Sequence, residues 1–459
     1  MTLVKGIIFF SKAKSHSTFI IAVAFCLCAE LAITTIATAQ PIDKSTIYSP
    51  KTLQQERIKQ QAGLWKYGIL PVLKLTPDST NEHLFQGALG AISQFMLKND
   101  TTRQILDSLF ANYNAINTET KRSMMEVVYG LYKGAYLKET KAHWPNEPSD
   151  KVATMMVVHL YRANKNLVDS AAFNRRIIVD TTAQNRLWKN TDLVQTAILT
   201  YFPEFRKGAK PKLTDFFEHQ KELGTKIIYS FQRENRDFPG LAIVQNADGS
   251  FIKDAKGKLK TFVQLARSAS NLPYFITDGS TPQGIFRIDS TDISKNQFIG
   301  PTPNIQLRMP NEIPGDSFFI HLNQPIIGNS IYLEEYDKLL PSRWQTDDMR
   351  QSFYAGKVGR SEIIAHGSTI DPSFYKGKPF YPNTPTMGCL CAKETWDPKT
   401  GKLLQSDQLD LVNAFLSTPG ADGYFFVINI DDQQKAVTQQ ELQLLVDGFE
   451  KKKRGVAKK

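Results

Sequence analysis

The chain has 459 residues, 41% of them hydrophobic, and its 56 Lys and Arg against 45 Asp and Glu give a formal net charge of +11. The composition excludes a collagen-like or low-complexity chain, and the length predicts two or more domains. The basic charge suits an anionic polymer, although charge alone does not separate cell wall, nucleic acid and lipid headgroups.

Residues 1–39 have the pattern of a secretory signal peptide. An apolar run at 19–36 follows three lysines, and Ala37-Thr38-Ala39 before Gln40 is a small-x-small cleavage site. Cleavage after residue 39 would remove three lysines and one glutamate, leaving a net charge of +9. We therefore expect an exported protein of the periplasm or cell envelope, and export argues against nucleic acid as a partner.

Two other interpretations of this segment stay open. The apolar run approaches the roughly 20 residues that span a bilayer, so it could be an uncleaved anchor. Cys26 could be a lipoprotein cysteine, but the bulky Phe25 stands where a small residue is expected. Glu30 within the run and the small residues at its end favour cleavage.

Residues 40–225 are predicted to form a helical domain of unknown role. Apolar residues recur at helical spacing after Thr102 and after Thr118, and prolines punctuate the segment into six to eight helices. Four histidines fall in this half with no chemistry that the sequence argues for: His83, His143, His159 and His219. Trp65 and Trp144 are interpreted as core residues.

Residues 226–432 are predicted to form a mixed, β-rich domain, so the fold class is α+β. Period-two runs predict strands at 227–229, 241–244, 261–265 and 424–430, and a hairpin turn at 247–250. Residues 433–459 predict a short closing helix, which begins with a capping box at Thr438 to Glu441, and then a basic tail from Lys451. The tail is interpreted as solvated, with wall or anionic-lipid binding as the alternative.

Cysteine usage raises the functional question. The chain has four cysteines, and cleavage at 39 would leave only Cys389 and Cys391. The pair could form a disulfide, hold a metal with His366, or contain a nucleophile. A metal site has no evident fourth ligand. A nucleophilic thiol needs a base, because an unperturbed thiol is only a few per cent ionised at neutral pH.

His366 is placed to be that base. The apolar segment 361–365 predicts a short strand that ends at His366-Gly367, where a side chain can emerge into a cleft. Gly388, directly before Cys389, permits a tight turn that aims backbone N–H groups at an oxyanion. His321 lies in another apolar run, Phe318 to Leu322, and is interpreted as structural.

Two segments together resemble the catalytic domain of L,D-transpeptidases of the YkuD type. The first comprises His366-Gly367 and Thr386-Met387-Gly388-Cys389, followed by an amphipathic stretch at 409–416 and a strand at 423–427. The second, residues 279–288, is similar to the Thr-Pro-x-Gly-x-Phe strand that these domains carry before the histidine. The resemblance covers about 226–432 and none of the helical half.

The resemblance implies a role for each matching residue. Cys389 matches the nucleophile, His366 the general base, Gly388 the oxyanion-hole backbone and Thr386 the preceding hydroxyl. Gly367 and Ser368 are expected to line the substrate site. Two positions depart from the family: Met387 replaces a second histidine, and Cys391 replaces an arginine or asparagine, which puts efficiency and substrate choice in question. The spacer between the histidine and Cys389 is also longer than in the family, and residues 375–385 are expected to form an extended flap.

The implied function is acyl transfer between peptidoglycan stem peptides, through a thioester on Cys389 and without a cofactor or metal. The helical domain would then bind the wall or an envelope protein. Two alternatives remain: an L,D-carboxypeptidase or thiol amidohydrolase, and a decayed site on a wall-binding scaffold. The adjacency of the two cysteines also suggests that pairing with Cys391 switches Cys389 off. Arg360, Lys393 and Tyr381 could contact substrate carboxylates but are interpreted as surface residues.

Overall fold

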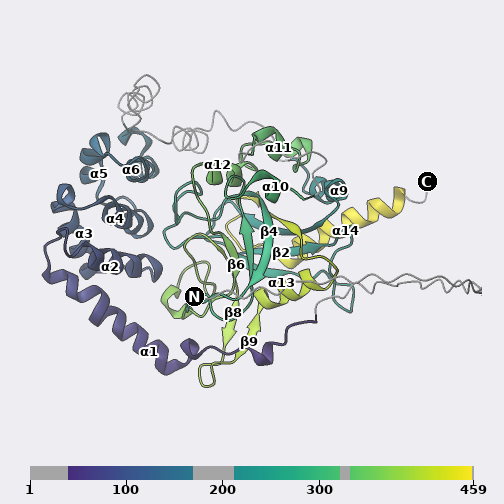
Figure 1. The fold of residues 1–459 in the computed structure, drawn as a ribbon, viewed down its shortest axis with the longest axis horizontal. Coiled ribbons are helices and arrows are strands. Elements are labelled where there is room, and N and C mark those ends of the chain that lie inside the picture. The colour runs from purple at the N-terminus through teal and green to yellow at the C-terminus, as the bar shows by residue number, and fades with distance from the viewer. Residues whose placement is uncertain (1–39, 169–210, 321–330, 457–459) are drawn as a thin grey trace, which may run out of the picture. The chain divides into compact units, whose positions relative to one another are not determined.

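The computed structural model describes residues 40–168, 211–320 and 331–456. The described residues belong to one compact unit. The α+β class is confirmed, since a helical region precedes a β-rich one (Figure 1). The predicted signal peptide and His321 lie outside the described residues. Among the residues described, no helix is both long and apolar enough to cross a membrane.

The helical region contains helices of seven to fourteen residues. These are α1 Gln54–Gly63, α2 Glu82–Gln94, α3 Asp100–Ala111, α4 Thr118–Leu131, α5 Leu137–His143 and α6 Asp150–Ala163, and α9 Thr214–Leu223 follows before the sheet. Polar caps start three of them: the Asn99 side chain accepts the Thr102 amide before α3, Asn117 accepts the Thr120 amide before α4, and Ser149 accepts the Val152 amide before α6. Trp144 is fully buried, as predicted.

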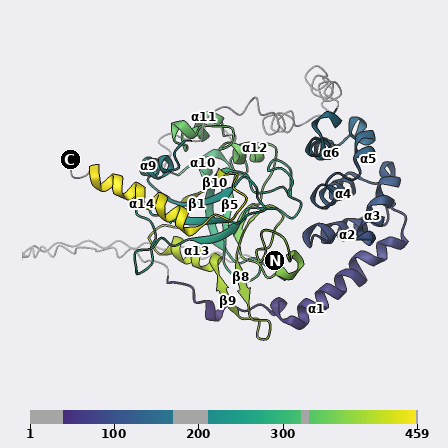
Figure 2. The ribbon, with the colours of Figure 1, turned by 180° about the vertical axis from the view of Figure 1, so that it is seen from behind.

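The β-rich region is a closed barrel of eight strands in the order β1-β10-β4-β5-β6-β7-β3-β2. The β1–β10 and β6–β7 pairs are parallel and the other pairs are antiparallel. Figure 2 shows β1, β5 and β10 of this barrel. The strands are β1 Lys226–Arg233, β2 Gly240–Gln245, β3 Phe262–Leu265, β4 Gly284–Asp292, β5 Asn304–Arg308, β6 Ile364–His366, β7 Leu390–Ala392 and β10 Gly423–Asp431. A separate pair comprises β8 Glu394–Trp396 and β9 Leu403–Ser406.

Alternation along the strands divides their apolar residues between two cores. In β1, Ile228 belongs to one cluster, while Ile227 and Tyr229 belong to the other. The second cluster is completed by side chains from the helices around the barrel: α9, α10 Gly315–Phe318, α11 Leu333–Asp337, α12 Gln351–Lys357 and α14 Gln439–Val456. Strands β1 and β2 are buried along their whole length.

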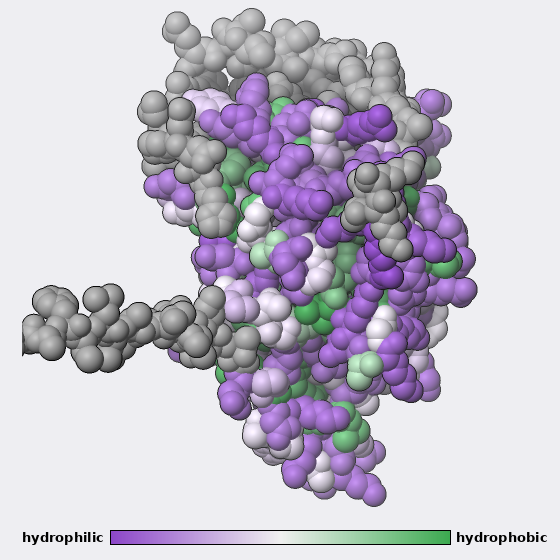
Figure 3. Space-filling model, turned by 90° about the vertical axis from the view of Figure 1, so that its right-hand side faces the viewer, coloured by the Kyte–Doolittle hydropathy of each residue, from purple (hydrophilic) through white to green (hydrophobic). Residues whose placement is uncertain are grey.

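The helical region and the barrel share a continuous core. One cluster of buried residues runs from Phe85 and Val128 in the helices to Phe286 and Leu390 in the barrel. The predicted boundary near 225 coincides with the change from α9 to β1, but apolar packing crosses it. On the face shown in Figure 3, hydrophilic residues predominate and the hydrophobic ones form small separate groups.

Three predictions of local structure need correction. Helix α14 continues through the basic run to Val456, so Lys451 is helical and not part of a tail. Phe318 ends the short helix α10 and lies in no strand. The spacer before Cys389 is not a free flap: Tyr375 and Phe380 are buried with Leu265, and the Tyr375 hydroxyl donates to the Gln94 carbonyl at 2.7 Å.

Helix α4 approaches the loop before β4 closely at Gly130. A Cβ built on Gly130 would lie 3.1 Å from both Cα and the carbonyl oxygen of Ser270. Replacing a helical glycine by alanine ordinarily stabilises by about 0.5–1 kcal/mol. We expect that gain for Gly87→Ala in α2, where a Cβ would meet nothing within 4 Å. Gly130→Ala should give no gain or a loss in urea unfolding. Equal gains at both positions would contradict close packing of α4 on this loop.

Candidate active site

The segment before β7 forms a turn that is closed by side-chain hydrogen bonds. The Gly388 amide donates to the Thr386 hydroxyl at 3.0 Å, and that hydroxyl donates to the Cys389 carbonyl at 2.9 Å. The Thr281 hydroxyl donates to the Gly388 carbonyl at 2.9 Å, across 107 residues of sequence. The two segments that carried the family resemblance therefore meet at Gly388.

Arg360 lies directly beside this turn. Its side chain is 4% exposed, and it donates to the carbonyls of Ser280 at 2.9 Å and Gly279 at 2.5 Å and to that of Tyr274. Burial lowers the pKa of the guanidinium to about 10, and the charge of Asp278 and, when it is ionised, that of Cys389 oppose this shift. The interpretation of Arg360 as a surface residue was wrong. The arginine follows α12 and brings positive charge close to Cys389, in a stretch where the sequence offered no motif.

The Cys389 thiol is partly exposed and protonated at rest. It donates to the Glu362 carbonyl at 3.7 Å. Desolvation by its surroundings raises its pKa to about 11; the Ile364 amide and Arg360 lower it, while the charges of Asp278 and Glu362 raise it further. Attack by this sulfur therefore requires a base that removes its proton during the reaction.

His366 lies on the strand next to Cys389. In the parallel β6–β7 pair, His366 is level with Cys391, and Cys389 lies in the bend directly before β7. The thiol bonds to the Glu362 carbonyl rather than to the imidazole. The structure thus places the histidine on β6 and the cysteine at the start of the neighbouring strand, without a direct hydrogen bond between them.

The imidazole of His366 is neutral and oriented. It is 5% exposed, and its Nδ1 lies 2.5 Å from the Gly367 carbonyl oxygen. A carbonyl only accepts, so Nδ1 carries the proton and Nε2 is left as the basic nitrogen. Burial lowers the His366 pKa to about 4.

The other predicted residues are engaged within the fold. The Gly388 amide, predicted to serve the oxyanion, is taken by Thr386, which leaves the Cys389 amide as the other donor of the predicted pair. Ser368 is buried, and its hydroxyl accepts the Ile370 amide at 3.2 Å. Contact of Gly388 and Ser368 with a substrate stays a prediction. Met387 is 40% exposed and Tyr381 43% exposed.

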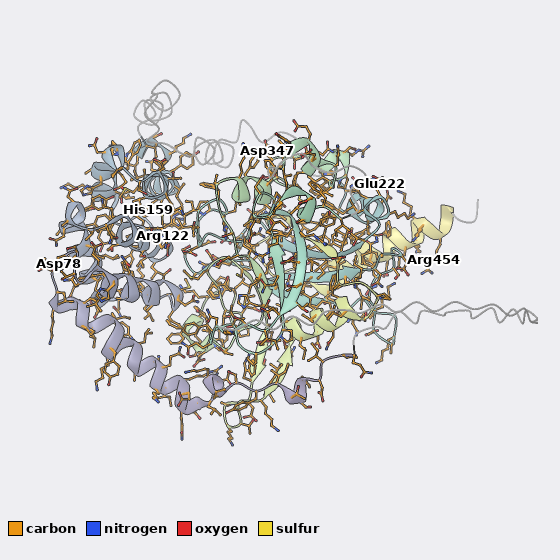
Figure 4. All side chains as sticks on the ribbon, viewed as in Figure 1. Asp78, Arg122, His159, Glu222, Asp347 and Arg454 are labelled. Atoms are coloured by element: carbon orange, nitrogen blue, oxygen red, sulfur yellow. The ribbon has the colours of Figure 1, made fainter. Side chains whose placement is uncertain are left out.

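The helical region braces the loop that holds Arg360. Arg122 of α4, labelled in Figure 4, pairs with Asp278 at 3.7 Å, and Lys151 of α6 donates to the Thr277 hydroxyl at 2.9 Å. Buried Glu126 hydrogen-bonds Asp278, and burial together with this neighbour raises the Glu126 pKa. Asp278, at a positive φ of 62°, directly precedes Gly279. Sequence reasoning missed this network because its members come from three distant segments.

Cys391 is a buried strand residue. Its thiol lies 3.3 Å from the Thr384 hydroxyl, and its backbone pairs with Leu265 on one side and His366 on the other. An extended strand separates Cα atoms two residues apart by about 6.6 Å and keeps their Cβ atoms nearly as far apart, against the roughly 3.8 Å that a disulfide needs. A bond to Cys389 would therefore require β7 to deform. Both thiols are free.

The metal alternative finds no support where the chain is described. Over residues 40–168, 211–320 and 331–456, no group of three or more His, Cys, Asp or Glu side chains is arranged to hold a metal ion. His159 (Figure 4) instead bonds the Ala135 carbonyl at 2.9 Å within the helical core, as a structural histidine does.

His366 and the nearby Glu394 give stability opposite dependences on pH. The lowered pKa of His366 means that the unfolded chain binds its proton first, so stability is lost as pH falls from 6.5 toward 4. Burial raises the Glu394 pKa to about 7, so stability is lost as pH rises from 4.5 toward 7. In His366→Gln only the effect of Glu394 remains. The free energy of unfolding of this variant, compared with that of wild type, should therefore fall by about 2 kcal/mol as the pH rises from 5 to 7. Urea titrations that give parallel pH profiles for the two proteins would contradict the neutral, buried histidine.

Comparison with protein-family models, with curated proteins and with solved structures found no match to this chain. The site must therefore be interpreted from its own geometry and from the two sequence segments that meet in it.

Proposed function

We propose that the protein is a cysteine-dependent L,D-transpeptidase of the YkuD type that acts on peptidoglycan stem peptides in the cell envelope. The observation that carries the proposal is the meeting of the Gly279–Gly284 segment with the Gly388–Cys389 turn, joined by Thr281 and Arg360. These are the two segments whose sequence resembles that family. His366 on the adjacent strand supplies a neutral base, and Arg360 a fixed positive charge.

In the proposed reaction, the Cys389 sulfur attacks the carbonyl of the third stem residue while its proton moves to Nε2 of His366. The tetrahedral intermediate collapses, the C–N bond to the terminal D-amino acid breaks, and the departing amine takes the proton from His366. An amine of a second stem then attacks the thioester. Its nitrogen bonds to the carbonyl carbon, and the sulfur leaves and regains a proton. Substrate must bring the histidine and the thiol into proton-transfer range, since hydrogen bonds of this kind often tighten only in the complex.

Incubation of the reduced protein with tetrapeptide muropeptides tests the proposal by mass spectrometry of the products. Cross-linked dimers support transfer. Loss of the terminal D-residue without dimers would indicate hydrolysis and not transfer, and would favour the carboxypeptidase alternative. No product from a folded protein would reject both enzymatic functions.

A wall-binding scaffold is the second candidate. It is favoured by the occupied Gly388 amide, by the raised pKa of Cys389 and by Met387 in place of the family's second histidine. The helical region would then supply a binding surface for the wall or an envelope protein. Co-sedimentation with purified wall in the absence of any turnover would favour this candidate.

A further inference from the structure

The orientation of His366 depends on a single peptide group. The Gly367 carbonyl that bonds Nδ1 belongs to the same peptide plane as the Ser368 N–H. A trans peptide points these two groups in opposite directions, so whatever holds the N–H also sets the direction of the carbonyl. The group that binds the Ser368 N–H therefore also determines where the basic nitrogen of His366 lies.

Strand β8 holds that peptide and the one after it. The Ser368 amide donates to Oε2 of Glu394 at 2.9 Å. The indole N–H of Trp396 donates to the Ser368 carbonyl at 2.9 Å. Hydrogen bonds in a chain polarise each other, so an accepting oxygen of Glu394 on the Ser368 N–H strengthens the Gly367 carbonyl as an acceptor for the histidine.

The fit at Gly367 shows how close this contact is. A Cβ on Gly367 would lie 2.1 Å from the carboxyl carbon of Glu394. The same carboxylate accepts the Ser406 hydroxyl at 2.6 Å, which in turn accepts the Leu409 amide at the start of α13 Asp407–Leu416. Glu394 is thus fixed by groups from β9 and α13. It contacts Gly367 and Ser368, the two residues expected to line the substrate site, at their backbone.

We propose that Glu394 and Trp396 are positioning residues for His366, which hold the Gly367–Ser368 peptide so that Nδ1 is protonated and Nε2 faces the reaction. The proposal rests on the assignment of His366 as the base in the proposed function. Without these hydrogen bonds to the Gly367–Ser368 peptide, the enzyme would bind its substrate normally but would transfer the proton slowly.

The test compares Glu394→Ala with Glu394→Gln, whose amide oxygen can still accept the Ser368 N–H, and with Trp396→Phe, which keeps an aromatic ring and loses only the donor. Glu82→Gln is the matched control: Glu82 is a buried carboxylate that accepts the Asn117 amide at 2.8 Å in the helical region. Histidine side-chain NMR reads the tautomer, with the His366→Gln spectrum identifying the signal. Kinetics on muropeptides separate kcat from KM.

We expect Glu394→Ala to mix the His366 tautomers and to lower kcat about 10- to 100-fold with KM within twofold. Glu394→Gln should restore most of the loss, Trp396→Phe should give a smaller loss, and Glu82→Gln should match wild type. An unchanged tautomer in Glu394→Ala, or equal losses in the alanine and glutamine variants, would overturn the proposal. If Glu394→Ala fails to fold, Trp396→Phe and the glutamine variant decide by the same NMR readout. A lack of turnover by the wild-type protein would refute the proposed function. The NMR measurement of the His366 tautomer would still test whether Glu394 and Trp396 orient the histidine.

Discussion

Replacing Cys389 by alanine should abolish acylation and turnover, by about 10⁴-fold or more, because nothing else in the site can form the covalent intermediate. Cys391→Ser is the matched control. It changes the chain's neighbouring thiol, which lies in β7, is buried and is 3.3 Å from the Thr384 hydroxyl. We expect it to retain activity within a few fold. Turnover of muropeptides and alkylation by iodoacetamide, read by mass spectrometry, measure both variants.

The same pair of variants tests the proposed redox switch. The separation imposed by β7 predicts that an oxidant inactivates wild type and Cys391→Ser equally, through direct oxidation of Cys389. Protection in Cys391→Ser, with a reducible loss of two hydrogens in wild type, would show that the strand opens and that the cysteines do pair. Alkylation of wild type should also rise with pH well above 8, since burial raises the Cys389 pKa to about 11.

The second large effect is expected at Gly388. Its φ of 121° is rarely adopted by other residues, and a Cβ would lie 2.2 Å from Nη2 of Arg360 and 2.7 Å from the Gly279 carbonyl oxygen. Gly388→Ala must therefore strain the turn and displace the arginine. We expect the free energy of unfolding to fall by about 2–4 kcal/mol and activity to be lost even where the variant remains folded.

Gly359→Ala provides the control for backbone strain alone. Gly359 has a φ of 85°, adjoins Arg360, and would place a Cβ in open space with nothing within 4 Å. Its expected cost is about 1–2 kcal/mol, with the active-site turn intact. If thermal unfolding and turnover respond equally to the two substitutions, the close approach of Arg360 to Gly388 is not what holds this turn.

Much of the fold could be predicted because its signals are local. Period-two runs located β1, β2, β3 and β10, and helical spacing located α3 and α4 within a few residues. The extension of α14 through Lys451 could not be predicted from charge, since a basic run is compatible with either helix or coil. The order of strands in the barrel depends on contacts between distant segments, which no local pattern encodes.

The site divides in the same way. Cys389 and His366 stood in short, recognisable segments, and the structure places His366 on β6 and Cys389 directly before the adjacent β7. Arg360 was misinterpreted because a lone arginine in a polar stretch resembles a surface residue, and only the folded loop supplies the three carbonyls that bury it. Glu394 carried one indirect signal, the glycine after His366, which permits the approach of another group.

The central claim, that Cys389 forms a thioester in the course of acyl transfer, is tested most directly by trapping it. The family resemblance predicts that a carbapenem acylates the reduced protein, and peptide mapping of the adduct by mass spectrometry locates the modified residue. The claim predicts one adduct per chain, on Cys389, absent from Cys389→Ala and slowed in His366→Gln. An adduct on another residue, or none on a folded protein with free thiols, would contradict it.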